Sequence, residues 1–373
     1  MPSIRGLITA LTASLLIGPW AVSSSHAAPA IAEGATCTAP LEMATVTVKK
    51  RKTRYICWQQ HDSPSAWRWT RFNPRLHPPY ALPQAVSWRT VPQPPFSGRS
   101  ATDPKDAKMV SDRLAQLATE VDYSWIEVDV EGRRTITAAV WKPRDSAKHP
   151  VIIDFHGTGG LIFWGYEFAA DLARSGYVVV APAWWGPRPS AVEPFFPSKQ
   201  MTGLFENPAG PEFTGANIET VRMLLPLIAA STQLTGADPS RIAVQGHSRG
   251  GTLALVVASA VPAISVAVSH AAAFLPPQLN GFITMKLSPP GWETLPRDIV
   301  HHLRAPTLVV AGMRDERVPV ASVRDYETWA GKAKRTNIEF AYLDAGHSMT
   351  HSYNQEWAAK TRELTLAFYA AHL

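Results

Sequence analysis

The sequence contains little cysteine and little charge. Among 373 residues there are two cysteines, Cys37 and Cys57, and 18% of the residues are charged. Neither cysteine has a metal-site partner spacing, so we expect no metal site and no cofactor. A hydrophobic fraction of 46% excludes bulk disorder. The formal net charge of +6 is too small by itself to indicate nucleic-acid binding.

The chain also lacks a long apolar run. The apolar stretch from Leu7 to Val22 is interrupted at Gly18-Pro19 and is short for a membrane span. Arg5 precedes it and small residues follow, which is typical of a secretory signal peptide. We therefore expect residues 1–27 to be removed, no stable membrane anchor, and a secreted or periplasmic protein. A retained membrane anchor is the alternative, and Ala28/Ala30 is a second candidate cleavage site.

Export would place both cysteines in an oxidising compartment. Paired there, Cys37 and Cys57 would close a loop of about twenty residues, worth ~3 kcal/mol in the chain-entropy model. We expect this disulfide, the alternative being two free thiols in a flexible segment.

No internal repeat and no second glycine-rich phosphate loop occur in the chain. Residues 28–108 differ from the rest, being rich in proline and tryptophan. Between 31 and 100 ten Lys/Arg stand against three acids, a net +7, so the positive charge is concentrated here. We interpret 28–108 as a basic N-terminal arm. Its tryptophans would dock on the main domain, or it would form a module that binds a polymer or an envelope surface.

Residues 109–373 read as one α/β domain. The segments 124–132 and 134–143 alternate as a hairpin around Glu131-Gly132. After them, short runs apolar on both faces alternate with amphipathic helices, one of which ends near Gly176. This pattern predicts a mainly parallel central sheet, covered by helices on both faces, with the leading hairpin as an antiparallel edge.

The stretch RIAVQGHSRGGTLALVVASA, residues 241–260, carries the strongest chemical signal. Gly246 and Gly250 flank Ser248 at −2 and +2, an apolar strand precedes it, and an alanine- and leucine-rich helix follows. Such a strand–turn–helix exposes the serine Oγ at the tip of a strained turn, beside the N–H groups of the helix N-terminus. We therefore interpret Ser248 as a nucleophile.

A serine hydroxyl needs a base, and the base needs an orienting acid. His347 in YLDAGHSM follows the last predicted strand, with His351 as its rival. Asp315 in MRDERVP follows the strand 306–312, with Glu316 beside it and a turn-capping role as its alternative. Asp344 lies too close in sequence to His347 and is expected to shape the turn. The order Ser248, Asp315, His347 is the one expected for this fold.

Acyl transfer also needs donors for an oxyanion. We expect the backbone N–H of Arg249 to supply one donor and the loop HGTGG, 156–160, to supply the other through Thr158 or Gly159. His156 is expected to pack against this loop or orient it.

Four segments together resemble one superfamily: ADPSRIAVQGHSRGG, HGTGG, PTLVVAGMRDERVP and LDAGHS. Residues 120–373 look like an α/β-hydrolase, closest to the branch of dienelactone-hydrolase-like esterases and prolyl-oligopeptidase catalytic domains. The resemblance implies Ser248 as nucleophile, Asp315 as acid, His347 as base, and Arg249 with Thr158 as oxyanion donors. Dienelactone hydrolase itself has a cysteine where this chain has Ser248. The segment before the core is too short for the propeller of prolyl oligopeptidases.

The sequence thus predicts an exported serine hydrolase acting on a small-molecule or polymeric carboxylic ester. A peptidase of prolyl-oligopeptidase type and a non-catalytic binding protein on the same fold are the alternatives. The pocket is expected from residues 183–196 and 270–304, whose aromatic and proline content favours an apolar site. No acidic pair for a substrate amine is evident, which favours an ester.

Overall fold

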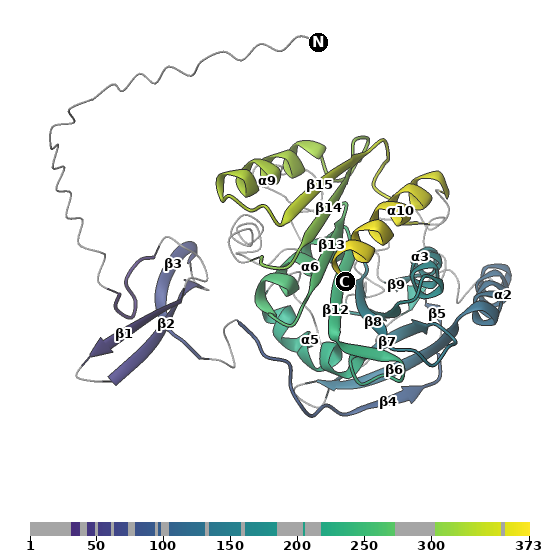
Figure 1. Ribbon diagram of the computed structural model, residues 1–373, viewed down its shortest axis with the longest axis horizontal. Coiled ribbons are helices and arrows are strands. Elements are labelled where there is room, and N and C mark those ends of the chain that lie inside the picture. The colour runs from purple at the N-terminus through teal and green to yellow at the C-terminus, as the bar shows by residue number, and fades with distance from the viewer. Residues whose placement is uncertain are drawn as a thin grey trace, which may run out of the picture.

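The computed structural model describes residues 31–37, 43–48, 51–60, 63–73, 79–93, 96–97, 104–130, 134–157, 161–184, 204–205, 218–272, 303–351 and 355–373. A nine-stranded sheet dominates these residues (Figure 1). In order across the sheet its strands are β15 (Ile338–Leu343), β14 (Thr307–Gly312), β13 (Val266–His270), β12 (Ala237–His247), β8 (His149–Phe155), β10 (Val178–Pro182), β7 (Arg134–Lys142), β6 (Asp122–Val130) and β4 (Trp88–Val91).

The pairing of neighbouring strands changes once across this sheet, from parallel to antiparallel. From β15 to β10 all neighbours run parallel, whereas β10–β7, β7–β6 and β6–β4 are antiparallel. The expected hairpin is therefore confirmed as β6 and β7, and the mainly parallel sheet with it. One more strand, β4, lies outside the hairpin, so the sheet begins before residue 109.

Helices cover both faces of the sheet, as the apolar strands predicted. On one face α5 (Ile218–Ser231), α6 (Arg249–Ala260) and α9 (Val320–Lys332) belong to one buried apolar cluster, which includes the odd-numbered residues of β8. On the other face α2 (Pro104–Glu120), α3 (Phe163–Arg174) and α10 (Gln355–His372) form a second cluster around Ile152 and Tyr369. A parallel strand buried on both faces needs this arrangement. None of the described helices has the length and apolarity that a membrane crossing requires.

Two small sheets complete the described residues. β5 (Phe96–Ser97), β11 (Leu204–Phe205) and β9 (Leu161–Ile162) form one, in the order β5-β11-β9. The other consists of β1 (Met43–Val48), β2 (Arg51–Gln60) and β3 (Ser63–Arg71), paired antiparallel. Figure 1 shows this second sheet at one side of the nine-stranded sheet.

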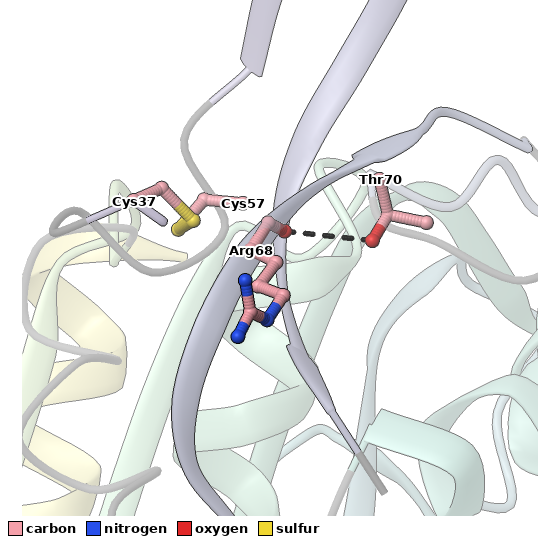
Figure 2. Close-up of a disulfide and its surroundings, with 4 residues drawn as sticks. All are labelled: Cys37, Cys57, Arg68 and Thr70. Carbon is pink, nitrogen blue, oxygen red and sulfur yellow. Dashed lines mark hydrogen bonds between the residues drawn. A yellow bond between two sulfur atoms is a disulfide. The ribbon is translucent and has the colours of Figure 1, made fainter. Parts of the chain in front are cut away.

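A disulfide joins Cys37 to Cys57 of β2 (Figure 2). We call the sheet of β1, β2 and β3 the N-terminal sheet. Trp69 packs against it as a small buried cluster, and the Trp69 N–H donates to the carbonyl of Ala35. Trp69 is thus buried against the disulfide of the N-terminal segment and belongs to a cluster separate from the core of the main domain. Ile56 of β2 belongs to the buried cluster of the main domain, as does Tyr80, whose N–H donates to the carbonyl of Ala260 at the end of α6.

One carboxyl of the main domain, that of Asp154, is at least half-buried and faces a neutral amide. Asp154 in β8 faces Gln245 in β12, and Gln245 Oε1 accepts a 2.8 Å hydrogen bond from the Tyr369 hydroxyl. Burial raises the pKa of Asp154 to about 7, partly opposed by the hydrogen bond from Gln245. The group therefore holds its proton more tightly in the folded chain than in the unfolded chain, where aspartate titrates near 3.9.

This shift predicts a pH-dependent stability. With the folded pKa raised, the contribution of Asp154 is complete below about pH 4 and is lost as the pH rises through about 7. Asp154→Asn removes the buried charge and keeps the shape, so its Tm should exceed that of wild type at pH 8 by several degrees. Thermal melts at pH 5 and pH 8 test this, because the advantage should be markedly smaller at pH 5. An equal difference at both pH values would contradict the shift.

Candidate active site

Ser248 lies at a strained turn between β12 and α6. Its backbone angles are φ 58° and ψ −121°, a positive-φ conformation that residues other than glycine rarely adopt. The residue is the N-cap of α6, and no side-chain capping bond accounts for its conformation. Its side chain is buried to 9% exposure. The strain is thus placed at one serine, next to the positive end of a buried helix.

The surrounding glycines explain how this turn fits. A Cβ at Gly246 would lie 2.3 Å from the carbonyl oxygen of Gly250, and one at Gly250 would lie 1.9 Å from that of Phe155. A Cβ at Gly251 would lie 2.9 Å from the oxygen of His270. Any larger residue would displace backbone of β8 or β13, so the Gly-x-Ser-x-Gly-Gly pattern is the condition for helix α6 passing this close to the sheet.

Asp315 and His347 come together at the carboxyl ends of β14 and β15. Both oxygens of the Asp315 carboxylate contact His347 Nδ1, Oδ1 at 3.0 Å and Oδ2 at 2.9 Å. The two loops can approach because position 312 is glycine, where a Cβ would lie 2.4 Å from the oxygen of Ala345. Both side chains are almost wholly buried, with 6% exposure for His347 and 2% for Asp315.

Backbone amides fix the carboxylate that faces His347. Asp315 Oδ1 accepts 2.8 Å hydrogen bonds from the N–H groups of Arg317 and Val318. A carboxylate held this way can keep the Nδ1 proton of His347, which leaves Nε2 as the acceptor nitrogen. The arrangement is the one that a general base requires.

The main chain of His347 is also held on both sides. Its N–H donates to Glu316 Oε2 at 3.3 Å. Its carbonyl accepts a 2.7 Å hydrogen bond from Nε2 of His247, the residue before Ser248. The rings of His247 and His347 lie 4.8 Å apart. Ser248 therefore follows directly in sequence a residue that contacts His347 through both its ring and a hydrogen bond.

The rivals considered from sequence lie elsewhere. Asp344 is 66% exposed and pairs with Arg314 at 2.7 Å, so it shapes the loop surface and does not contact the His347 ring. His351 is buried 4.9 Å from the ring of His247. Burial, with the charges of His347 and Arg317, lowers the pKa of His351 to about 3, so it stays neutral at neutral pH.

The loop after β8 begins beside Ser248. A Cβ at Gly157 would lie 3.2 Å from Ser248 Cβ, so this loop starts in contact with the serine. His156 donates from Nδ1 to the Gly157 carbonyl at 2.7 Å and stacks on Trp184 with ring centres 5.5 Å apart. Burial lowers the pKa of His156 to about 4, so the ring is neutral and orients the loop. The expected donors Thr158 and Gly159 lie outside the described residues.

Arg249 is the first residue of α6, so its backbone N–H points out of the helix N-terminus and has no acceptor within the helix itself. Its side chain is 2% exposed. Burial lowers the pKa of Arg249 to about 10, which leaves the guanidinium charged at neutral pH.

Two contacts were not anticipated from sequence, the His247 bond to the His347 carbonyl and the Glu316 bond to the His347 N–H. The Gly-x-Ser-x-Gly pattern leaves the residue type at position 247 open, so it carries no signal for His247. Within the described parts of the chain, no three His, Cys, Asp or Glu side chains gather as a metal site would require. Of the expected pocket segments, residues 185–196 and 273–302 lie outside the described residues.

Comparison with known proteins places this geometry in context. Residues 136–372 match the model of the dienelactone hydrolase family. A Klebsiella pneumoniae protein described as a dienelactone hydrolase is 18% identical, with a TM-score of 0.50 over 65% of this chain and 97% of its own. The acylaminoacyl peptidase of Pyrococcus horikoshii is 14% identical, with a TM-score of 0.51 over 70% of this chain and 43% of its own.

A puromycin-hydrolyzing peptidase of Mycobacterium tuberculosis is 15% identical, with a TM-score of 0.50 over 68% of this chain and 40% of its own. At such identities the solved structures establish a shared fold. The chain spans less than half of each of the two peptidases. A search of the curated proteins found no match.

Proposed function

Because the chain belongs to the dienelactone hydrolase family, we propose that it is an exported serine hydrolase that cleaves a carboxylic ester. The observation that carries the proposal is the Asp315 carboxylate on His347 Nδ1, with His347 held by the residue that precedes Ser248. Serine, histidine and aspartate at the ends of three parallel strands of one sheet have the order and roles of an acyl-transfer triad.

The proposed reaction has two halves. Ser248 Oγ attacks the ester carbonyl while His347 Nε2 takes its proton, and the backbone N–H groups of Arg249 and Thr158 bind the oxyanion. The intermediate collapses to an acyl-serine, and His347 returns the proton to the departing alcohol. Water then attacks the acyl-serine with His347 again as base, which releases the acid and restores Ser248.

The burial of the site supports this chemistry. Burial lowers the pKa of His156 to about 4 and that of His351 to about 3, so both rings are weaker bases than an ordinary histidine and poor acceptors of the serine proton. The strain at Ser248 is a cost of about 1–3 kcal/mol that a binding protein would have no reason to keep. A non-catalytic function on the same fold is therefore disfavoured.

An ester is favoured over a peptide as the substrate. The sequence shows no acidic pair for a substrate amine, and the chain spans 43% of the acylaminoacyl peptidase that shares its fold. We expect purified protein to hydrolyse p-nitrophenyl esters of short and medium acyl chains. On aminoacyl p-nitroanilides the kcat/KM should be at least about 100-fold lower. Higher kcat/KM on the anilides would favour the peptidase alternative.

The Cys37–Cys57 disulfide supports export, because such bonds persist in oxidising compartments. We propose that residues 1–27 are a signal peptide, 28–108 an N-terminal arm and 109–373 the catalytic domain, with the arm contributing the edge strand β4 to the sheet of that domain.

The exported protein should begin near Ala28, and Cys37 and Cys57 should react with an alkylating reagent only after reduction. Intact-mass spectrometry with and without reductant, each followed by alkylation, measures both features. A retained N-terminus, or two thiols that alkylate without reduction, would contradict export.

A further inference from the structure

His247 sits between the two loops that flank Ser248. Its Nε2 lies 2.7 Å from the carbonyl oxygen of His347. Its Nδ1 faces Gly157, where an added Cβ would come within 3.3 Å of that nitrogen. One side chain of strand β12 therefore contacts the start of the loop after β8 and the loop after β15.

The chemistry of the contact fixes the direction of the hydrogen bond. A carbonyl oxygen only accepts, so Nε2 of His247 carries the proton and donates it. Burial, together with the charges of His347 and His351, holds the pKa of His247 well below its ordinary range. In the neutral ring the proton on Nε2 leaves Nδ1 unprotonated, so His247 cannot also donate from that nitrogen.

This bond matters for the proposed reaction because of where its two residues lie in the chain. His247 is bonded covalently to Ser248, and its acceptor is the backbone of His347. The bond therefore links the side chain of the residue before Ser248 to the main chain of His347, and the proton must move between Ser248 and His347. The ring of His347 is already fixed by Asp315 and its N–H by Glu316. The remaining freedom, the approach of the whole loop toward Ser248, is restrained by His247.

We propose that His247 is a positioning residue, whose Nε2–H holds the His347 carbonyl and so sets the spacing between Ser248 and His347. This inference rests on the proposed function, because it concerns the same serine and histidine. His247 itself makes no proton transfer. A shift of about 1 Å between reacting groups can cost on the order of 100-fold in rate, which is the scale on which its loss should act.

The test is a pair of variants of equal length, His247→Gln and His247→Met. The glutamine amide nitrogen reaches about as far as His247 Nε2 and can donate to the carbonyl, whereas methionine fills similar space without a donor. We expect His247→Met to lower kcat on a p-nitrophenyl ester by about 10- to 100-fold, with KM within about threefold. The rate of fluorophosphonate labelling should fall by a similar factor. His247→Gln should recover kcat to within about fivefold of wild type.

His247→Asn supplies a second comparison if His247→Met folds poorly. Its amide is one methylene shorter and cannot reach the carbonyl, so it should behave as the methionine variant does, although it is polar. Equal kcat for the glutamine and asparagine variants, or unchanged kcat in His247→Met, would overturn the inference. Equal losses of kcat that follow a loss of Tm would instead assign His247 a purely structural role and would also overturn it.

Failure of the inference can be told apart from failure of the proposed function. If wild type is labelled and active, Ser248→Ala is neither, and His247→Met matches wild type, only the positioning role is lost. If wild type is neither labelled nor active on any ester or anilide, the proposed function fails, and the positioning role fails with it.

Discussion

Ser248→Ala is expected to lower kcat on esters by at least about 10⁴-fold. The only atom removed is the Oγ that the proposed mechanism makes the nucleophile, and the base and the oxyanion donors cannot replace it. Alanine keeps the Cβ of serine at φ 58°, so the strain of the turn is unchanged. The variant should therefore fold as wild type does, with Tm within about 2 °C. Initial rates on p-nitrophenyl esters and a thermal melt measure both quantities.

Ser248→Gly is the matched control for this prediction. Glycine adopts positive φ without a steric cost, so it should relieve part of the strain at this turn. We expect it to be as inactive as Ser248→Ala but to melt at higher temperature. A glycine variant no more stable than the alanine variant would show that the turn stores little strain. Hydrolysis that survives in both variants would assign the nucleophile to another residue.

Asp315→Asn is expected to lower kcat by about 10³- to 10⁴-fold at neutral pH. The two backbone N–H donors of Arg317 and Val318 would hold the amide oxygen in the place of Oδ1. The amide nitrogen would then donate to His347 Nδ1, which moves the ring proton to Nε2. In that tautomer His347 cannot accept the proton of Ser248. The loss of negative charge also removes the stabilisation of the imidazolium.

Two neighbouring carboxyl groups provide the controls for Asp315→Asn. Asp344→Asn should change kcat by less than about threefold, because Asp344 is exposed and pairs with Arg314. Glu316→Gln keeps an oxygen that can accept from the His347 N–H, so its loss should be below about tenfold. Steady-state kinetics of the three variants decide the assignment. If Asp344→Asn is the crippling change and Asp315→Asn is nearly silent, Asp315 is not the acid.

The architecture of the main domain was readable from sequence because its strands are buried on both faces. Runs such as 151–155 and 307–312 have no polar alternation, which only a covered parallel sheet allows. The strand β4 was missed since its four residues, WRTV, lie in a proline-rich segment and are half-exposed or exposed at the sheet edge. Local sequence gives little signal for such an edge strand.

The N-terminal sheet shows a similar limit. Residues 28–108 were recognised as distinct by charge and composition, and the Cys37–Cys57 pairing was expected. The strands β2 and β3 were not expected, because exposed basic residues interrupt the apolar positions on their faces. Arg54 and Arg71, for example, are exposed, although each shares a strand face with a buried residue, Ile56 and Trp69 respectively.

Residues of the candidate site were identified where backbone geometry restricts the residue type. Gly246 and Gly250 are required because a Cβ at these positions would lie 2.3 Å and 1.9 Å from backbone oxygens. The turn at Ser248 therefore leaves a pattern in the sequence. The contact between Asp315 and His347 followed from strand order. The roles of His247 and Glu316 depend on tertiary approach between loops, which no spacing in the sequence encodes.

Covalent labelling of wild type with a fluorophosphonate, followed by trypsin digestion, tests the central claim most directly. The account predicts one adduct per chain on the peptide Ile242–Arg249, in which Ser248 is the single serine. Esterase activity should fall in proportion to that labelling. An adduct on a different peptide that accompanies the loss of activity, or full activity in chains labelled at Ser248, would contradict the assignment of Ser248 as the nucleophile.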